Sequence, residues 1–141
     1  DARQKRWFDS LLTDTSKNYL IFEVVQENSW KKAGMARITE IDLTNRSACV
    51  GADIHAAYRG QGLAMPLYKK IFELCFEYYN LHRLWLLVLE KNQRARHLYA
   101  RLGFIEEGRQ REAILRHGEF HDYIMMSFLP HPQKPKPKPG E

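Results

Sequence analysis

The spacing of hydrophobic positions changes several times along the chain, and each change predicts a different element. Apolar residues recur at helical spacing among charged ones over residues 2–12, which predicts an amphipathic helix. The next three segments are rich in β-branched and aromatic residues and are predicted strands: 19–26, 33–43 and 47–55. We expect turns between these strands, at residues 27–32 and 44–46.

The third predicted strand alternates clearly between two faces. One face is apolar and is expected to pack in the core: Ala48, Val50, Ala52 and Ile54. The other face combines small and ionisable side chains: Cys49, Gly51, Asp53 and His55. Small residues beside titratable ones leave room on this second face for another molecule to approach.

The second half of the chain opens with a long predicted helix and a buried strand. The helical period covers residues 62–80, with Pro66 in the first turn, where its missing N–H costs little. The apolar stripe of this helix is formed by Leu63, Leu67, Ile71, Leu74 and Tyr78. Residues 83–89 are continuously apolar, which is typical of a strand covered on both faces.

A shorter helix and a hairpin complete the pattern. Residues 92–102 predict a helix with Asn92 as its N-cap and Gly103 as its stop signal. Residues 109–116 and 119–128 predict two strands joined by a tight turn. This order of elements predicts an α/β (α+β) protein, with a mixed and mostly antiparallel sheet flanked by helices.

The composition narrows the classes of function. The formal net charge is +5, but residues 130–141 carry three Lys against one Glu and contribute +2 of it. The remaining +3 forms no one-sided basic stripe, so no nucleic-acid partner is expected. The longest apolar run, residues 84–89, is too short to span a membrane, so no membrane partner is expected. The Pro-Lys alternation of residues 130–141 predicts a disordered tail.

Cysteine usage favours a reducing compartment. Cys49 and Cys75 have neither metal-binding nor redox spacing, and the chain opens on charged residues rather than on a signal peptide. We therefore expect a cytoplasmic protein with reduced thiols and no metal.

The segment "YRGQGLAMPL", residues 58–67, places Gly60 and Gly62 where the long predicted helix begins. A Walker loop requires G-x-x-x-x-G-K-[ST], which is absent, and the dinucleotide fingerprint requires a third glycine where Met65 stands. Two interpretations are open from these residues alone. Amides at the helix N-terminus bind a phosphate that the glycines allow to approach closely, or the glycines only turn the chain into the helix.

Three blocks of the sequence resemble the GNAT N-acetyltransferases. Arg59-x-x-Gly62-x-Ala64, after a strand and before a long helix, is similar to the family's R/Q-x-x-G-x-G/A signature. Residues 117–129 resemble the closing hairpin of bacterial ribosomal-protein N-terminal and spermidine acetyltransferases. Residues 90–104 resemble the family's N-x-x-A-x-x-x-Y-x-x-x-G-F segment, through Asn92, Ala95, Tyr99, Gly103 and Phe104.

This resemblance covers residues 33–129 and implies a GNAT fold, with one domain over residues 1–129. The family begins with a strand and a helix that precede the helix expected at 2–12. We therefore expect the first strand to be missing from this chain, and one side of the acceptor pocket to be incomplete. Residues 3–12 and 40–54 together also resemble amino-sugar-nucleotide N-acetyltransferases, which are close relatives.

The resemblance implies acetyl-CoA as the co-substrate, used without a metal. Its pyrophosphate is expected at the turn formed by Arg59, Gly60, Gln61, Gly62, Leu63 and Ala64. A backbone amide near Ile54 to Ala56, at a bulge in the strand, is expected to polarise the thioester carbonyl. Asn92 is expected to contact the pantetheine arm in addition to capping its helix.

The resemblance also gives Tyr99 the role of proton donor to the departing CoA thiolate. Without the resemblance, an aromatic residue on the apolar stripe of a helix would be interpreted as core. The acceptor amine must lose a proton, and Asp53 or His55 is expected to take it, directly or through water. The alternative is that these two residues only form a solvated polar face. Some GNAT enzymes use no single strong base.

Several further residues are candidates for binding the acceptor. Glu40 and Asp42, on one face of the neighbouring strand, are second choices for the base, and with Asp53 they would suit a cationic polyamine. An amino-sugar nucleotide would favour basic groups: Arg37, Arg109, Arg111 and Arg116. Three hairpin residues are expected either to set specificity or to be surface charges: Glu112, His121 and Asp122.

Together these features predict an acetyl-CoA-dependent N-acetyltransferase that uses direct attack in a ternary complex. The expected acceptor is a small-molecule amine, either a polyamine or an amino-sugar nucleotide, and a protein N-terminus is the alternative. A Cys49→Ala variant tests the minor possibility of an acetyl-cysteine intermediate. Two rivals stay open: a non-catalytic CoA-binding module, and nucleic-acid binding through the tail, which would weaken steeply with salt. A homodimer is expected because relatives often dimerise through the sheet or hairpin.

Overall fold

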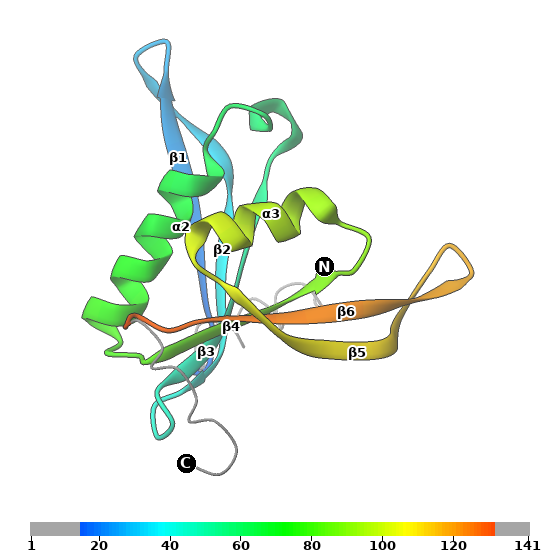
Figure 1. The fold of residues 1–141 in the computed structure, drawn as a ribbon. Helices are drawn as coiled ribbons and strands as arrows, with labels where there is room; N and C mark the ends of the chain where they lie inside the picture. The colour runs from blue at the N-terminus through cyan, green and yellow to red at the C-terminus, as the bar shows by residue number, and fades with distance from the viewer. Residues whose placement is uncertain (1–14, 132–141) are drawn as a thin grey trace, which may run out of the picture.

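A single six-stranded sheet with the helices α2 and α3 makes up the described part of the chain (Figure 1). The computed structural model describes residues 15–131. The helix expected at residues 2–12 and all but the first two residues of the expected tail lie outside this range.

The strands lie in the spatial order β1 (Asn18–Gln26), β2 (Ser29–Asp42), β3 (Ser47–Ile54), β4 (Arg83–Leu89), β6 (Glu119–Phe128) and β5 (Ile105–Arg116). Only β3 and β4 are parallel, because a helical crossover connects them, and the other neighbouring strands are antiparallel. The prediction of a mixed, mostly antiparallel sheet is confirmed.

The turn between β1 and β2 is shorter than the sequence predicted. Glu27 and Asn28 both have positive φ, 52° and 59°, as in the two-residue turns that match the twist of a hairpin. The predicted turn over residues 27–32 is therefore wrong beyond Asn28, and Trp30 lies in β2, paired with Val25. Both of these side chains are exposed, so the alternation that marks a half-buried strand is absent here.

The long helix differs from its predicted form at both ends. The helix α2 (Ala64–Glu73) begins two residues later than expected and continues as one π-helical turn, η2 (Leu74–Tyr78). The i→i+5 bond from Tyr79 N to Leu74 O (3.1 Å) adds a residue to this turn and rotates the following side chains. Tyr78 is 76% exposed as a result, so the predicted stripe is wrong at Tyr78, whereas Cys75, four residues after the buried Ile71, is buried.

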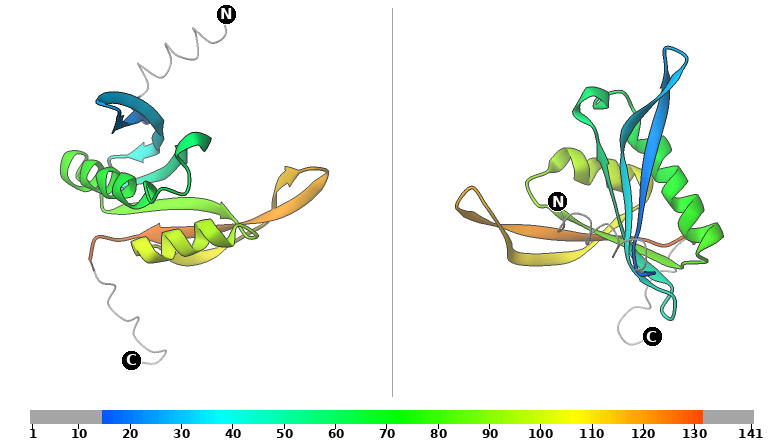
Figure 2. Two further views of the ribbon diagram at one scale, coloured as in Figure 1. Left: turned by 90° about the horizontal axis from the view of Figure 1, so that it is seen from above. Right: turned by 180° about the vertical axis from the view of Figure 1, so that it is seen from behind.

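The strand β4 and the helix α3 form as the sequence predicted. β4 occupies residues 83–89, and α3 (Gln93–Leu102) begins after Asn92, whose Oδ1 accepts from Ala95 N (3.1 Å). α3 ends at Gly103, which lies in the left-handed region. The β5–β6 hairpin starts earlier than expected, at Ile105, and projects beyond the rest of the described chain (Figure 2).

One hydrophobic core joins the two parts of the sheet. Its fully buried side chains come from β2, β3, β4, β6 and the α2–η2 segment, and include Ile38, Ala48, Leu84, Met126, Ile71 and Cys75. An aromatic cluster extends this core at the α2 end, where the rings of Phe72 and Phe128 stack with centroids 4.5 Å apart. The predicted core face of β3 is confirmed at Ala48 and Val50.

Leu84 provides a test of this core, because its side chain is 0% exposed in the central strand β4. We expect Leu84→Ala to lower the free energy of unfolding by about 2–5 kcal/mol, since it loses apolar burial and leaves a cavity. Urea unfolding followed by circular dichroism measures the change. Leu43→Ala, at an exposed turn position, should change stability by less than about 0.5 kcal/mol. Equal stability losses in the two variants would contradict the core described above.

Candidate active site

The strands β3 and β4 part after a short parallel ladder. They pair at Ser47–Arg83, Ala48–Leu84 and Cys49–Trp85, and the described residues form no further pairs between them. On the other side, β3 stays paired with β2 as far as Ile54. Because backbone groups alternate in direction along a strand, the N–H and C=O of Ala52 and Ile54 point toward the side that β4 has left. Figure 1 shows the two strands diverging beyond the ladder.

A glycine turn lies at the end of β3, where the strands are apart. The chain passes through a short 3₁₀ turn, η1 (Ala56–Tyr58), and then through Gly60 and Gly62, with φ of 75° and 73°. A Cβ on either glycine would meet nothing within 4 Å, so the surface beside this backbone is open. The glycines are therefore explained by backbone conformation and not by internal packing.

The amides after these glycines belong to an uncapped helix start. The first intrahelical bond into α2 runs from Leu67 N to Leu63 O (3.1 Å), so the amides of residues 62–65 precede it. Leu63 occupies the N-cap position and provides no side-chain cap. Such amides, together with the helix dipole, attract an anion. Arg59 adds a positive charge at this point, and its Nε donates to Ile54 O (2.9 Å).

The carboxylate of Asp53 forms an ion pair with the guanidinium of Arg37 on β2. The Arg37 side chain crosses Gly51, where a Cβ would lie 2.6 Å from Nη2, so the glycine makes space for this pair. From the sequence, Arg37 is predicted to bind an anionic acceptor and Asp53 a cationic one. The structure brings the two together. By strand alternation they lie on the face opposite Ala52, which packs against the core.

His55 has a backbone role. Its Nδ1 accepts a hydrogen bond from Ala57 N (3.3 Å), which caps the 3₁₀ turn. This bond occupies Nδ1 and leaves Nε2 as the ring nitrogen that faces away from the turn backbone. The strand pairing is regular up to His55, whose N–H donates to Ala33 O (2.7 Å). The bulge expected near Ile54 to Ala56 is absent from the described register, which shifts instead between Thr39 and Asp42.

Glu40 and Asp42 lie at the other end of the sheet from the glycine turn. Asp42 pairs with Ser47, whereas Asp53 lies six residues further along β3, a separation of about 20 Å. The Asp42 carboxylate accepts from Asn45 N (2.9 Å) and Asn45 Nδ2 (2.9 Å), and these bonds lower the pKa of Asp42. The structure therefore gives Asp42 a role in the turn, and does not bring it together with Asp53.

Tyr99 lies half-buried on α3, where its ring contacts those of Tyr68 and Phe104 at centroid distances of 5.8 Å each. Its hydroxyl lies 3.5 Å from the hydroxyl of Tyr68. Tyr68 is not among the site residues predicted from the sequence. A second helical stripe, formed by Ala64, Tyr68, Ile71 and Cys75, contains the signal that would have found it.

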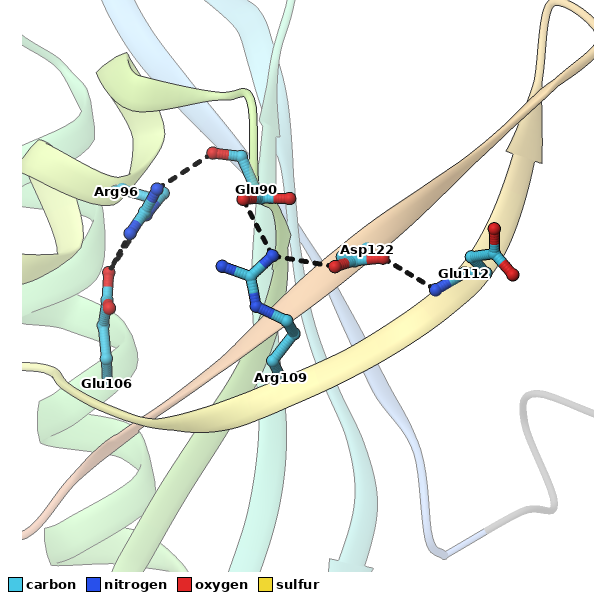
Figure 3. A network of polar contacts seen from close by, with 6 residues as sticks. All are labelled: Glu90, Arg96, Glu106, Arg109, Glu112 and Asp122. Carbon is cyan, nitrogen blue, oxygen red and sulfur yellow. Dashed lines mark hydrogen bonds and ion pairs between the residues drawn. The ribbon is translucent and has the colours of Figure 1, made fainter.

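An arginine–carboxylate network occupies the base of the hairpin (Figure 3). Arg109 Nη1 contacts both Glu90 Oε1 and Asp122 Oδ2 at 2.7 Å, and Asp122 Oδ1 accepts from Glu112 N (2.7 Å). The register of β5 and β6 shifts between Gln110 and Ile114, opposite Asp122. Asp122 therefore holds an irregular segment in place.

This network connects the hairpin to the start of α3. Arg96 Nη1 donates to Glu90 O (3.0 Å), while its Nε and Nη2 donate to Glu106 Oε1 (Figure 3). A hollow beside the network is lined by Gln110, Arg111, Glu112 and Asp122. Of the predicted specificity residues, Glu112 and Asp122 are thus adjacent. His121 instead pairs with Ile114 in the β5–β6 ladder, and Arg116 lies at the hairpin tip, paired with Glu119.

Two features are absent from residues 15–131: a cluster of metal ligands and a membrane-spanning helix. No group of three His, Cys, Asp or Glu side chains there is arranged to hold a metal ion, and no helix in that range has the length and apolar character needed to cross a membrane. Burial raises the pKa of Cys49, and raises that of Cys75 to about 12. Both thiols are therefore poor nucleophiles at neutral pH.

Comparison with known proteins identifies the family. The model of the acetyltransferase (GNAT) family matches residues 1–104. The chain is 31% identical over 124 residues to a spermidine N(1)-acetyltransferase of Escherichia coli (strain K12), a match that covers 88% of this chain and 64% of that protein. It is 30% identical over 96 residues to Bacillus subtilis (strain 168) YdaF, whose name describes a ribosomal N-acetyltransferase, with coverages of 68% and 52%.

A solved structure extends this likeness to the fold. The spermidine N-acetyltransferase from Vibrio cholerae, in complex with CoA and spermine, matches with a TM-score of 0.85 and 27% identity, covering 91% of this chain and 74% of that one. The chain therefore belongs to the GNAT acetyltransferase family, and the fold implied by its motifs is confirmed. It spans 64% of the length of the Escherichia coli relative and 52% of the length of YdaF.

The role of Asp122 in the hairpin predicts a dependence of stability on pH. Hydrogen bonds from Glu112 N and Arg109 lower the pKa of Asp122 in the folded chain below that of an ordinary aspartate. We expect Asp122→Asn to be less stable than the unmodified chain at neutral pH. The difference should be complete above the unfolded pKa and should shrink as the pH falls through the lower folded pKa.

Urea unfolding of both chains at a series of pH values tests this. Glu119→Gln, which alters an exposed carboxylate of the same hairpin, serves as the control and should have a smaller effect. A stability difference for Asp122→Asn that stays constant down to the acid limit would contradict the assignment.

Proposed function

We propose that this chain is an acetyl-CoA-dependent N-acetyltransferase that moves an acetyl group to a primary amine by direct attack in a ternary complex. One observation carries the proposal: an open glycine turn with uncapped helix amides lies at the end of β3, where β4 has diverged. Family membership and the likeness to a structure that contains CoA support the same function.

The glycine turn suits the pyrophosphate of acetyl-CoA. The amides from Gly60 to Ala64 would bind its oxygens, and the positive charge of Arg59 would add to the attraction. The backbone amide of Ile54, at the end of β3, or that of Ala56, in the turn that follows, would polarise the thioester carbonyl. Asn92 uses Oδ1 to cap α3, so its amide NH₂ group stays able to donate to the pantetheine arm.

The proton transfers fall to residues on two faces of the sheet. Tyr99 would donate its phenolic proton to the departing thiolate sulfur. Asp53 would receive the proton of the attacking amine, through water, because its carboxylate is held in place by Arg37. His55 is the weaker candidate, since Nδ1 is already occupied by Ala57 N–H. Neither thiol is required.

The acceptor we propose is a small-molecule amine of the polyamine class. The spermidine acetyltransferases of Escherichia coli and Vibrio cholerae support this choice. The amino-sugar nucleotide is less favoured, because Arg37 and Arg109 are already paired with carboxylates. The similarity to YdaF keeps a protein N-terminus as the alternative acceptor. Self-association as a homodimer and a cytoplasmic location stay predictions.

Release of CoA from acetyl-CoA is the first test. We expect turnover with spermidine, and slower or no turnover with a UDP-linked amino sugar or with a peptide that has a free N-terminus. Turnover with only the peptide would reassign the acceptor class. If no acceptor reacts while acetyl-CoA still raises the melting temperature, a CoA-binding module would replace the enzyme as the better hypothesis.

The glycine turn can be tested separately by binding. Gly62→Ala places a Cβ on a residue with φ of 73°, which costs about 1–2 kcal/mol and displaces the amides that follow. We expect acetyl-CoA to bind at least about tenfold more weakly by isothermal titration calorimetry. Gly118→Ala is a matched control, because Gly118 has φ of 76° and equally open surroundings at the hairpin tip. Equal affinities for the two variants would argue against phosphate binding at the turn.

A further inference from the structure

Two tyrosine hydroxyls meet between the helices. Tyr68 on α2 and Tyr99 on α3 have their oxygens 3.5 Å apart, and their rings meet edge to face, with an interplanar angle of 77°. Tyr68 is only 2% exposed, whereas Tyr99 is half-buried. The two hydroxyls therefore lie within hydrogen-bond distance of each other, one buried and one at the edge of the core.

The surroundings of Tyr68 decide which hydroxyl donates. Its ring packs against Phe72 in the core, at a centroid distance of 6.5 Å, and desolvation raises the pKa of Tyr68 well above its usual value. Tyr68 therefore stays protonated at physiological pH. Its hydroxyl donates a hydrogen bond to the oxygen of Tyr99. Because the Tyr99 oxygen accepts from this side, its own proton is directed elsewhere.

We propose that Tyr68 is a positioning residue that orients the proton of Tyr99 and stabilises the Tyr99 phenolate. This assignment rests on the proposed function. In the reaction, the amine nitrogen bonds to the acetyl carbon, and the C–S bond breaks with its electron pair on sulfur. Tyr99 gives its proton to sulfur and becomes a phenolate. Tyr68 then donates to an anion, a stronger hydrogen bond than before. The amine proton leaves through water, and solvent reprotonates Tyr99.

The other charged groups near Tyr68 oppose one another. Arg37 on β2 favours ionisation of Tyr68 and Asp53 on β3 disfavours it, and these two residues form an ion pair. Tyr99 is the remaining titratable group that acts on Tyr68. The raised pKa of Tyr68 is therefore set chiefly by burial and by the contact with the Tyr99 hydroxyl.

Kinetics of Tyr68→Phe test the assignment, because this variant removes only the hydroxyl. We expect kcat to fall about tenfold, which is the effect of losing one hydrogen bond to a charged group, with KM unchanged for both substrates. The alkaline limb of the pH profile should move to higher pH, since the Tyr99 phenolate has lost its donor. Tyr99→Phe should lose more, and the double variant should lose no more than Tyr99→Phe alone.

A matched control separates this role from general damage. Tyr79→Phe removes another half-buried hydroxyl, which accepts from Asn18 Nδ2 (2.8 Å) away from the site, and it should leave kcat and the pH profile unchanged. An NMR titration of ¹³Cζ-labelled tyrosine gives a readout without turnover. The Tyr99 signal should titrate at higher pH in Tyr68→Phe than in the unmodified chain.

The outcomes distinguish this assignment from the proposed function. Absence of turnover in the unmodified chain would overturn both. Turnover in the unmodified chain, with the rate, pH profile and Tyr99 titration unaltered in Tyr68→Phe, would overturn the assignment alone. Losses that add in the double variant would likewise overturn it, because they would show that Tyr68 acts independently of Tyr99.

Discussion

The short parallel ladder between β3 and β4 is the constraint on which the rest of the structure depends. Only the pairs from Ser47–Arg83 to Cys49–Trp85 hold the two strands, and beyond them β3 follows β2 alone. The backbone of Ala52 and Ile54 thereby loses a strand neighbour on one side, where only Ile54 O has a described partner, Arg59 Nε. Since unpaired strand groups require a partner, the divergence creates a surface suited to a polar chain such as pantetheine. The glycine turn follows directly at the end of that strand.

Because the ladder is short, side-chain packing must hold the two parts of the sheet together. α2 covers β2 and β3, and its Phe72 stacks on Phe128 of β6. Phe104, which follows α3, contacts both of these rings. Burial of aromatic rings of this size contributes several kcal/mol, more than a few additional ladder bonds would supply. The same packing brings Tyr68 and Tyr99 together, so the proposed catalytic pair is a product of the core.

The elements that depend on residues close together in the sequence were predicted correctly. β4, α3 and its Asn92 cap follow from residues that are neighbours in sequence, and the motif at Arg59 led to the right family. Prediction from the sequence failed where contacts between distant segments determine the structure. The π turn after α2 leaves Tyr78 exposed although it continues the helical spacing, and the ion pair of Arg37 with Asp53 depends on the register of two strands. No periodicity records such contacts, so the arrangement of the site required the fold.

A general acid and a general base that act in one acetyl transfer must not exchange a proton with each other before the substrates bind between them. In the proposed reaction this separation comes from the sheet itself. Tyr99 lies on α3, on the helical face of the sheet, with its hydroxyl beside that of Tyr68. Asp53 lies on the opposite face, where its carboxylate forms an ion pair with Arg37. If β3 and β4 were paired along their whole length, the sheet would separate Tyr99 from Asp53, and the two could not act on one substrate. The parting of β3 and β4 allows both to do so, without exchanging a proton directly with each other.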